Sequence, residues 1–237
     1  MKAVILAGGK GTRLAPYTKI LPKPLMPIGD MPILEVLLRQ VKYAGVDEVV
    51  LTVGHMAELL RAFFQNGEGL ALPIRYSYEE KPLGTAGPLS MIGGLEDAFL
   101  VMNGDVLTTL DFSKLVEDHR KSGAMVTVAV HPREVKVDLG VLKLAEDNRV
   151  VDYIEKPTYK FDVSMGIYVF DPRVLAFIPQ NEYLDFPNLI LKLIAAGELV
   201  KVFRYDGYWM DLGRPDDYEQ AVADFDRMKA EFLPERG

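Results

Sequence analysis

The stretch that decides the fold is residues 2–14, KAVILAGGKGTRL. Residues 2–6 are a short run rich in β-branched side chains that stops before Gly8, as a buried parallel strand does. The three glycines of the following loop let backbone N–H groups approach an anion closely, and Lys10 and Arg13 add positive charge. The pattern indicates a phosphate-binding loop at the end of a strand; a plain turn with solvated charges is the alternative.

The loop differs from two common nucleotide-binding motifs. It lacks the Gly-Lys-Ser/Thr ending of a Walker A loop and the third glycine of the dinucleotide fingerprint. It also runs into Pro22-Lys23-Pro24 instead of a helix. Lys23 brings one more positive charge that suits a polyphosphate.

Strands and helices alternate after the loop. Asp30 is expected to be a helix N-cap with Pro32 in the first turn, and Gly45 to end that helix. This alternation is typical of a doubly wound sheet, in which ligands bind outside the carboxyl ends of the strands, and both Gly8 and Asp105 follow such ends. The other elements expected in this half are strands at 48–53, 73–78 and 99–102 and helices at 57–64 and 86–95.

The pattern changes after residue 123. Several strands follow with little helix between them, which predicts a more antiparallel second half that forms a sugar-sized lid on the same sheet. These strands are expected at 126–130, 140–144, 150–154 and 165–170, and helices near 183–196 and 215–232 close the chain.

Composition excludes several kinds of site. The chain has 237 residues, of which 49% are hydrophobic and 26% charged, so we expect a globular protein with a full core. It has no cysteine, which excludes disulfides, thiolate metal sites and a cysteine nucleophile. The histidines at 55, 119 and 131 show no zinc-ligand spacing. Metal chemistry is therefore expected on carboxylates, with hard cations.

Charge is distributed unevenly along the chain. The net charge of −7 argues against non-specific nucleic-acid binding, yet residues 1–30 hold five basic residues against Asp30, a net charge of +4. A basic loop on an acidic protein indicates a small anionic ligand. No uncharged apolar run reaches the roughly 20 residues that span a bilayer, and the run after Met1 is too short for a signal peptide. We expect a cytoplasmic protein with no membrane partner.

Six motifs follow one another along the whole chain. Their wording and order resemble those of the sugar-1-phosphate nucleotidylyltransferases, also called nucleotide-sugar pyrophosphorylases, and most of all the mannose-1-phosphate guanylyltransferase branch. The motifs are GGKGTRL (8–14) with PKPL (22–25), EEKPLGTAGP (79–88), NGD (103–105), EKP (155–157), MGIY (165–168) and WMDLG (209–213).

The resemblance implies a fold and a domain organisation. The fold is an α/β, Rossmann-like three-layer α/β/α sandwich with a mixed, mostly parallel central sheet. Residues 1–237 would form a single nucleotidyltransferase domain, with a nucleotide-binding half at 1–122 and a sugar-binding half at 123–237. The left-handed β-helix that some relatives carry after this domain is not expected.

The resemblance also implies catalytic and metal-binding roles. Arg13 would clamp the leaving pyrophosphate, for which its fork of donors suits better than a point charge. Lys23 would hold phosphate oxygens near the reacting phosphorus, and Asp105 and Asp211 would hold Mg²⁺. From the residues alone, Asp105 could be a turn residue and Asp211 a surface carboxylate. Trp209 is expected to be a core anchor for the strand of Asp211.

The remaining site residues implied by the resemblance fall into two groups. Those for the nucleotide are Leu6, Ala7, Gly8, Gly9, Gly11, Thr12, Arg13, Glu79, Gly84 and Thr85. Those for the sugar phosphate are Asn103, Gly140, Glu155, Lys156, Ser164 and Gly166. Ser164 departs from the family, because many relatives have Asn there. From the residues alone, Gly140 and Gly166 could instead be bulges in strands. Glu155 and Lys156 could form a surface ion pair, and Glu79 could be a solvated carboxylate.

The expected reaction follows from these roles. A nucleotidyl group passes from a nucleoside triphosphate to a sugar 1-phosphate, and pyrophosphate leaves. The Glu79 carboxylate could accept hydrogen bonds from the N1–H and N2–H₂ edge of guanine, which favours GTP, with mannose 1-phosphate or a relative such as heptose 1-phosphate. Alternatives are a uridylyl-, thymidylyl- or cytidylyltransferase acting on glucose 1-phosphate or another sugar 1-phosphate, and a regulatory protein that binds a nucleotide sugar. The enzyme is expected to be a monomer or homodimer.

Overall fold

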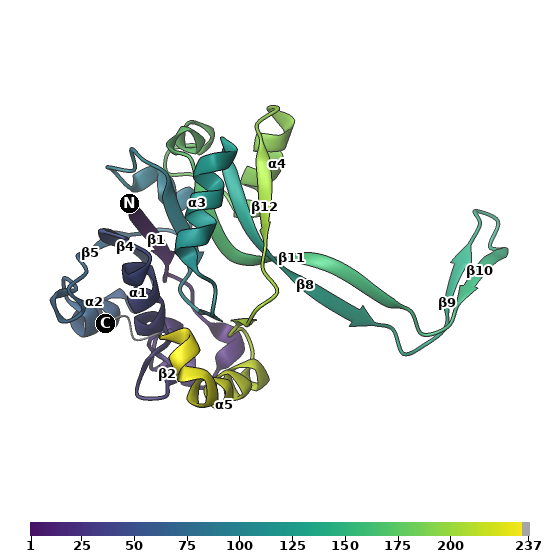
Figure 1. Ribbon diagram of the computed structural model, residues 1–237, viewed down its shortest axis with the longest axis horizontal. Coiled ribbons are helices and arrows are strands. Elements are labelled where there is room, and N and C mark those ends of the chain that lie inside the picture. The colour runs from purple at the N-terminus through teal and green to yellow at the C-terminus, as the bar shows by residue number, and fades with distance from the viewer. Residues whose placement is uncertain (234–237) are drawn as a thin grey trace.

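A seven-stranded sheet forms the centre of the computed structural model, which describes residues 1–233 (Figure 1). Six strands run parallel to one another, and β11 runs antiparallel to both of its neighbours. The predicted mixed, mostly parallel sheet is confirmed. In spatial order the strands are β12 (Val200–Arg204), β8 (Val126–Lys136), β11 (Thr158–Phe170), β6 (Phe99–Asn103), β1 (Lys2–Leu6), β4 (Glu48–Val53) and β5 (Ile74–Tyr78).

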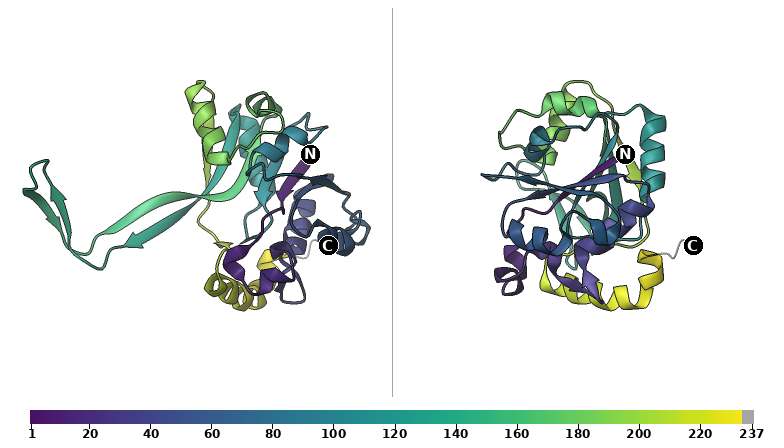
Figure 2. Two further views of the ribbon diagram at one scale, coloured as in Figure 1. Left: turned by 180° about the vertical axis from the view of Figure 1, so that it is seen from behind. Right: turned by 90° about the vertical axis from the view of Figure 1, so that its left-hand side faces the viewer.

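Helices cover both faces of this sheet, which gives three layers (Figure 2). Successive side chains of a strand point to opposite faces, so Ala3 and Ile5 belong to one core and Val4 to the other. All three are fully buried, which explains the continuous apolar run of a strand covered on both sides. The first core lies under α1 (Ile33–Tyr43), α2 (Ala57–Phe64) and α3 (Phe112–Ser122), and the second under α4 (Phe186–Ala195) and two 3-10 segments (Gly87–Met91 and Pro172–Phe177).

A third apolar cluster lies beside the sheet. The last helix, α5 (Pro215–Phe232), buries Phe225 and Phe232 against two small strand pairs. These pairs are β2 (Pro27–Ile28) with β3 (Met31–Pro32), and β7 (Val106–Thr108) with β13 (Trp209–Asp211). The cluster thereby fixes a late segment of the chain beside the end of β6.

Most of the expected elements are present, but two expectations on helices need correction and one helix was not expected. Asp30 does not cap α1, which begins after an extended Pro32; Asp30 instead accepts a hydrogen bond from Lys229 Nζ at 2.8 Å. The segment 86–95 forms only the 3-10 segment, because the glycines at 87, 93 and 94 disfavour a longer helix. The helix α3 was not predicted, although Asp111 caps it and Gly123 follows it with φ +66°.

The expected lid is an extended arm instead. Strands β8 and β11 continue beyond the sheet as a two-stranded ribbon that carries the hairpin of β9 (Val141–Leu144) and β10 (Val150–Ile154) away from the body (Figures 1 and 2). Their ladder pairs residues without interruption from Val130 with Ser164 to Lys136 with Thr158, so the ribbon does not fold back over the sheet. Residues 131–163 are called the arm below.

One observation concerns membranes. Within residues 1–233, no helix combines the length and the apolar character needed to cross a bilayer.

Candidate active site

A pocket of about 740 Å³ opens at the carboxyl edge of the parallel strands. The last residues of β1 and β6, Leu6 and Asn103, line it, as does Thr52 near the end of β4. The loop after β1 and the segment 79–85 after β5 complete the wall. The pocket therefore lies where ligands bind in open α/β sheets, as the sequence predicted. All the residues predicted to bind the nucleotide line this pocket: Leu6, Ala7, Gly8, Gly9, Gly11, Thr12, Arg13, Glu79, Gly84 and Thr85.

The glycine loop is shaped by close backbone approaches. A Cβ atom on Gly8 would lie 3.2 Å from Glu79 Oε1 and 3.3 Å from the Gly54 nitrogen. Gly11 has φ +59° and lies against Thr18, whose hydroxyl donates a hydrogen bond to the Gly11 carbonyl at 2.8 Å. Each position thus disfavours a side chain, which explains the glycines in this loop.

Lys23 joins two carboxylates that come from distant parts of the chain. Its buried ammonium donates a hydrogen bond to Asp105 and lies 3.8 Å from Asp211 Oδ1. Asp105 lies in the turn between β6 and β7, and Asp211 ends β13. The pairing of β7 with β13 brings them together, and the Leu212 N–H donates to the Asp105 carbonyl at 3.1 Å.

Arg13 reaches the same cluster from the glycine loop. It lies on a short 3-10 turn, Thr12–Leu14, that buried Leu14 anchors, while the Arg13 side chain itself is exposed. A Cβ atom on Gly213 would lie 3.4 Å from Arg13 Nη1 and 3.1 Å from Asp211 Oδ2, so both side chains converge at this glycine. The structure thus brings all four predicted catalytic and metal residues together.

The electrostatics of the cluster suit a bound cation. Burial and the neighbouring Asp105 raise the pKa of Asp211, against the opposing charges of Lys23 and Arg13. Within residues 1–233, no group of three or more His, Asp or Glu side chains could hold a metal ion by itself. Mg²⁺ is commonly bound by one or two carboxylates together with substrate phosphates. Two close carboxylates that destabilise each other fit that kind of site.

Glu79 lies in the pocket directly after β5. Its Oε2 accepts a hydrogen bond from the Leu83 N–H at 3.1 Å, and its Oε1 lies beside Gly8. Half-burial of the carboxylate raises its pKa. One oxygen is therefore held by the protein, and the other faces the glycine loop.

The residues predicted for the sugar phosphate divide into two places. Asn103 lines the pocket and contacts Gly166, where a Cβ atom would lie 2.5 Å from Asn103 Nδ2. Ser164 lies close by at the root of the arm and hydrogen-bonds the Tyr168 hydroxyl at 3.0 Å. The other three, Gly140, Glu155 and Lys156, lie on the outer part of the arm and do not line the pocket.

Trp209 anchors the strand of Asp211, as predicted. Its indole N–H donates to the Met165 carbonyl at 3.0 Å, and its ring lies 5.6 Å from that of His131. It is partly buried against the first core and is not among the pocket-lining residues. Its role is therefore in the packing that places Asp211.

Sequence reasoning missed several pocket residues. His55 follows the end of β4, a position that the strand-end rule could have identified. Tyr183 precedes α4 and carries no local signal, because only tertiary hydrogen bonds bring its segment to the pocket. The Thr85 N–H donates to Asp185 Oδ1 at 3.1 Å, and the Thr85 hydroxyl accepts from the Phe186 N–H at 2.8 Å.

Gly84→Ala should destabilise the fold. Gly84 has φ +78°, and a Cβ atom there would lie 2.6 Å from the Leu184 carbonyl oxygen. We expect a loss of about 1–3 kcal/mol in the free energy of unfolding, measured by urea denaturation. Gly93→Ala is the matched control, since open space surrounds Gly93. Equal stability of the two variants would contradict the close packing described for Gly84.

Comparison with known proteins gives consistent matches along the chain. Residues 2–227 match the family described as Nucleotidyl transferase. The chain is 34% identical, over 94% of its length, to the UTP–glucose-1-phosphate uridylyltransferase of Synechocystis, and 35% identical, over 95%, to the mannose-1-phosphate guanylyltransferase of Mycobacterium tuberculosis. It spans 62% and 64% of the length of these two relatives.

A solved structure shows the same fold. HddC from Yersinia pseudotuberculosis, crystallised in a complex with GMP-PN, superimposes with a TM-score of 0.71 at 26% sequence identity. The match covers 94% of this chain and 99% of that protein.

Proposed function

The chain belongs to the sugar-1-phosphate nucleotidylyltransferase family, and on that premise we propose that it transfers a nucleotidyl group from a nucleoside triphosphate to a sugar 1-phosphate, with release of pyrophosphate. The observation that supports this proposal best is the convergence of four side chains. Arg13, Lys23 and Asp105 line the pocket, and Asp211 lies directly behind them, beside Lys23 and the pocket-lining Gly213. A protein that only binds a nucleotide sugar has no need of a clamp for leaving pyrophosphate. The regulatory alternative is therefore less favoured.

The roles of these residues follow from charge and geometry. An oxygen of the sugar 1-phosphate attacks the α-phosphorus, a new phosphorus–oxygen bond forms, and the bond to the pyrophosphate oxygen breaks. Lys23 neutralises charge on the α-phosphate oxygens, and the Arg13 fork holds the departing pyrophosphate. Asp105 and Asp211 would hold Mg²⁺, which when bound supplies further neutralisation of phosphate charge.

GTP is the proposed nucleotide. Glu79 keeps one carboxylate oxygen on the Leu83 N–H and has the other beside Gly8 in the pocket. That oxygen suits the two donors on the guanine edge, whereas uracil and thymine present one donor flanked by carbonyls that a carboxylate repels. Identity to the guanylyl- and uridylyltransferase relatives is almost equal, so it does not choose between bases. The name of the Mycobacterium tuberculosis relative and the GMP-PN complex of HddC agree with a guanine nucleotide.

Mannose 1-phosphate is the proposed sugar substrate. The cytoplasm is the proposed location of the protein. The name of the Mycobacterium tuberculosis relative supports mannose, and a related sugar such as heptose 1-phosphate is the second candidate. Glucose 1-phosphate with UTP is the alternative that the Synechocystis relative favours.

A substrate matrix tests this function. GTP, ATP, UTP, dTTP and CTP are each combined with a panel of sugar 1-phosphates, and pyrophosphate release is measured with Mg²⁺ present. We expect the fastest release with GTP and mannose 1-phosphate. No release from any pair, together with tight binding of a nucleotide sugar in calorimetry, would identify a regulatory protein instead.

Glu79→Gln should reduce the preference for GTP. An amide binds the guanine edge less well and no longer repels the carbonyls of uracil, so the ratio of kcat/KM for GTP over UTP should fall by about 10-fold. Glu96→Gln, an exposed carboxylate outside the pocket, controls for loss of a charge. If Glu79→Gln leaves the ranking of nucleotides unchanged, the guanylyl proposal is wrong while the nucleotidyltransferase proposal stands.

A further inference from the structure

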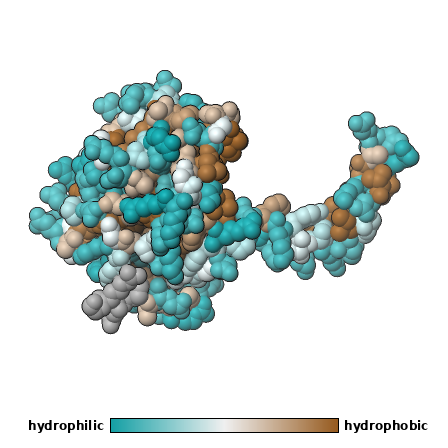
Figure 3. Space-filling view, turned by 45° about the horizontal axis from the view of Figure 1, so that its top comes forward, coloured by the Kyte–Doolittle hydropathy of each residue, from teal (hydrophilic) through white to brown (hydrophobic). Residues whose placement is uncertain are grey.

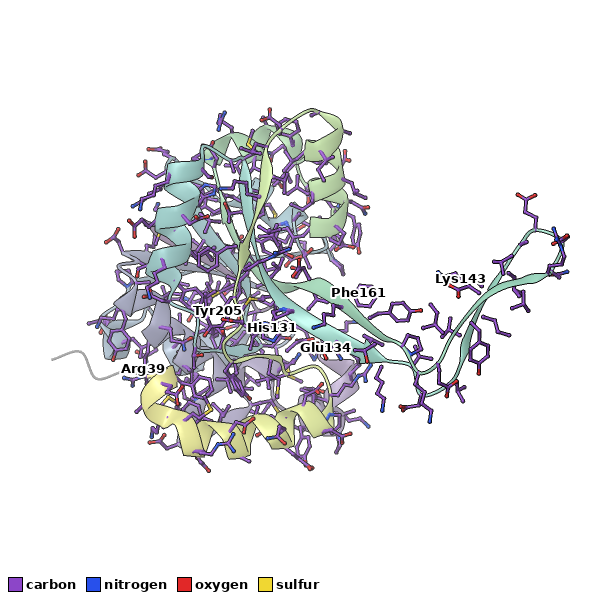
Figure 4. The ribbon with its side chains drawn as sticks, turned by 45° about the vertical axis from the view of Figure 1, so that its right-hand side comes forward. Arg39, His131, Glu134, Lys143, Phe161 and Tyr205 are labelled. Carbon is purple, nitrogen blue, oxygen red and sulfur yellow. The ribbon has the colours of Figure 1, made fainter. Side chains whose placement is uncertain are left out.

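The stem of the arm is its two-stranded part, residues 131–136 and 158–163. It has one charged face and one mainly apolar face. Strand pairing places Glu134 opposite Lys160 on the charged face, where their side chains form an ion pair at 2.9 Å. The other face is mainly apolar: it carries Val135 opposite Tyr159, and Phe161 beside them is paired with Arg133. Figure 4 labels Glu134 and Phe161 on the stem, where the arm leaves the body.

The hairpin at the end of the arm has an ion pair on one face, next to the Val141–Ile154 pair, and only apolar pairs on the other. Lys143 and Asp152 are cross-strand neighbours on one face and form an ion pair at 2.9 Å. Leu142 and Leu144 point to the opposite face, where Leu142 pairs with Tyr153. These apolar side chains are half exposed, and Figure 3 shows the resulting apolar surface on the arm.

The exposed apolar area of the arm is large enough for a stable interface. Nine large apolar side chains are exposed, by 39% to 75%: Val135, Leu139, Leu142, Leu144, Val150, Val151, Tyr153, Tyr159 and Phe161. Together they present several hundred Å² of apolar surface, and exposed apolar patches of that size mark interaction sites on soluble proteins. A two-stranded ribbon is also only marginally stable in water without packing.

The joint between the two-stranded stem and the end hairpin of the arm carries Glu155 and Lys156, two of the residues predicted for the sugar phosphate. Glu155 accepts a hydrogen bond from the Tyr153 hydroxyl at 3.0 Å. Lys156 has φ +45°, a conformation that is strained for a lysine, and within residues 1–233 it forms no ion pair. Strained residues persist where function requires their geometry. Both side chains lie away from the pocket of their own chain.

The root of the arm lies beside that pocket. Because β8 runs parallel to β1, β4 and β6, it leaves the sheet at the same carboxyl edge where the pocket opens. Gly166 at the root contacts Asn103 in the pocket wall. A twofold axis near the two roots would therefore let each arm cross to the pocket of the other copy.

We propose that two copies of this chain exchange their arms, so that Glu155 and Lys156 of one copy complete the sugar-phosphate side of the other copy's pocket. The interface is isologous, because each chain gives an arm and receives one. Exposed Tyr17 and Ile20 lie in the segment that joins Leu14 to Lys23 at the pocket, and they offer apolar surface to the incoming arm. The roles of Glu155 and Lys156 rest on the proposed function; the exchange of arms does not.

The oligomeric state tests the apolar face without any assay of activity. We expect the native chain to be a dimer by light scattering after size-exclusion chromatography, and the double variant L142S/L144S to be a monomer. The variant K143S/D152S on the opposite face of the same hairpin is the matched control and should remain a dimer. A monomeric native chain, or a dimeric L142S/L144S protein, overturns the proposal.

Site-specific cross-linking tests where the arm docks. The chain has no cysteine, so single cysteines can be introduced cleanly. Two differently tagged copies are co-expressed, one with Lys156→Cys and one with Lys10→Cys at the pocket, and are treated with a short bis-maleimide. We expect a covalent dimer for this pair and none when Lys10→Cys is replaced by Glu117→Cys on α3. No covalent dimer with Lys10→Cys overturns the proposal.

Complementation between two defective chains tests the shared site. One tagged copy carries Asp211→Asn in its pocket, the other carries E155A/K156A on its arm, and the mixed dimer is isolated through both tags. With exchanged arms, one of its two sites is intact, so it should show about half of the native activity. Activity as low as that of the two homodimers overturns the proposal. If the native chain is inactive with every substrate pair, the proposed function fails, and the oligomeric state and the cross-linking result then decide whether the arms are exchanged.

Discussion

Asp211→Asn should lower turnover by on the order of 10²-fold or more. The substitution keeps the size of the side chain but removes a negative charge 3.8 Å from Lys23 and adjacent to Asp105, where a cation and a polyphosphate are proposed to bind. Pyrophosphate release at saturating substrates, measured over a range of Mg²⁺ concentrations, gives the loss. Near-native turnover at saturating Mg²⁺ would contradict the proposed role. Asp97→Asn, an exposed carboxylate outside the pocket, should leave turnover unchanged.

The stability of the same variant separates this loss from misfolding. Burial and Asp105 raise the pKa of Asp211, so its ionised form destabilises the folded protein at every pH above that raised pKa. Asparagine removes this cost, and we expect the Tm of Asp211→Asn to exceed that of the native chain at pH 7. The difference should shrink as the pH falls through the raised pKa, because native Asp211 then becomes protonated. A variant less stable than the native chain at pH 7 would show that Asp211 has a structural role.

Arg13→Lys should lower kcat by about 10- to 100-fold, which corresponds to the loss of one hydrogen bond between charged groups. The lysine keeps the charge but loses the fork that can hold two pyrophosphate oxygens. The fold should survive, because Arg13 is exposed and forms no hydrogen bond or ion pair with any residue in 1–233. Circular dichroism should therefore be unchanged while turnover falls.

The control for this variant is Arg39→Lys. Arg39, labelled in Figure 4, forms an ion pair with Glu35 on α1 and is not among the pocket-lining residues, so the same change there should leave kcat unaffected. If Arg13→Lys instead unfolds the protein and the folded fraction keeps its specific activity, Arg13 is a structural residue.

The sequence determined the local chemistry of the site. The glycine loop, the strand before it and the polar residues at strand ends follow short-range rules, so the pocket was predicted at the correct edge of the sheet. The elements at 48–53, 57–64 and 215–232 were predicted with the bounds that the structure shows. Each of these three predictions depends on hydrophobic periodicity and on residues that end a helix or strand within a few positions. The division into halves at residue 122 stays a prediction.

Only the tertiary structure decided which distant residues meet. Local sequence does not place Asp211 beside Asp105; the pairing of β7 with β13, held by the apolar cluster under α5, does so. The path of the chain after Val130 could not be predicted from the sequence either, because a strand has the same alternation of side chains whether it folds over a sheet or extends away from it. The unbroken ladder of β8 and β11 selects extension, and it carries Glu155 and Lys156 away from the pocket of their own chain. Short-range patterns fix each strand, whereas pairing between strands depends on contacts that the whole chain must satisfy together.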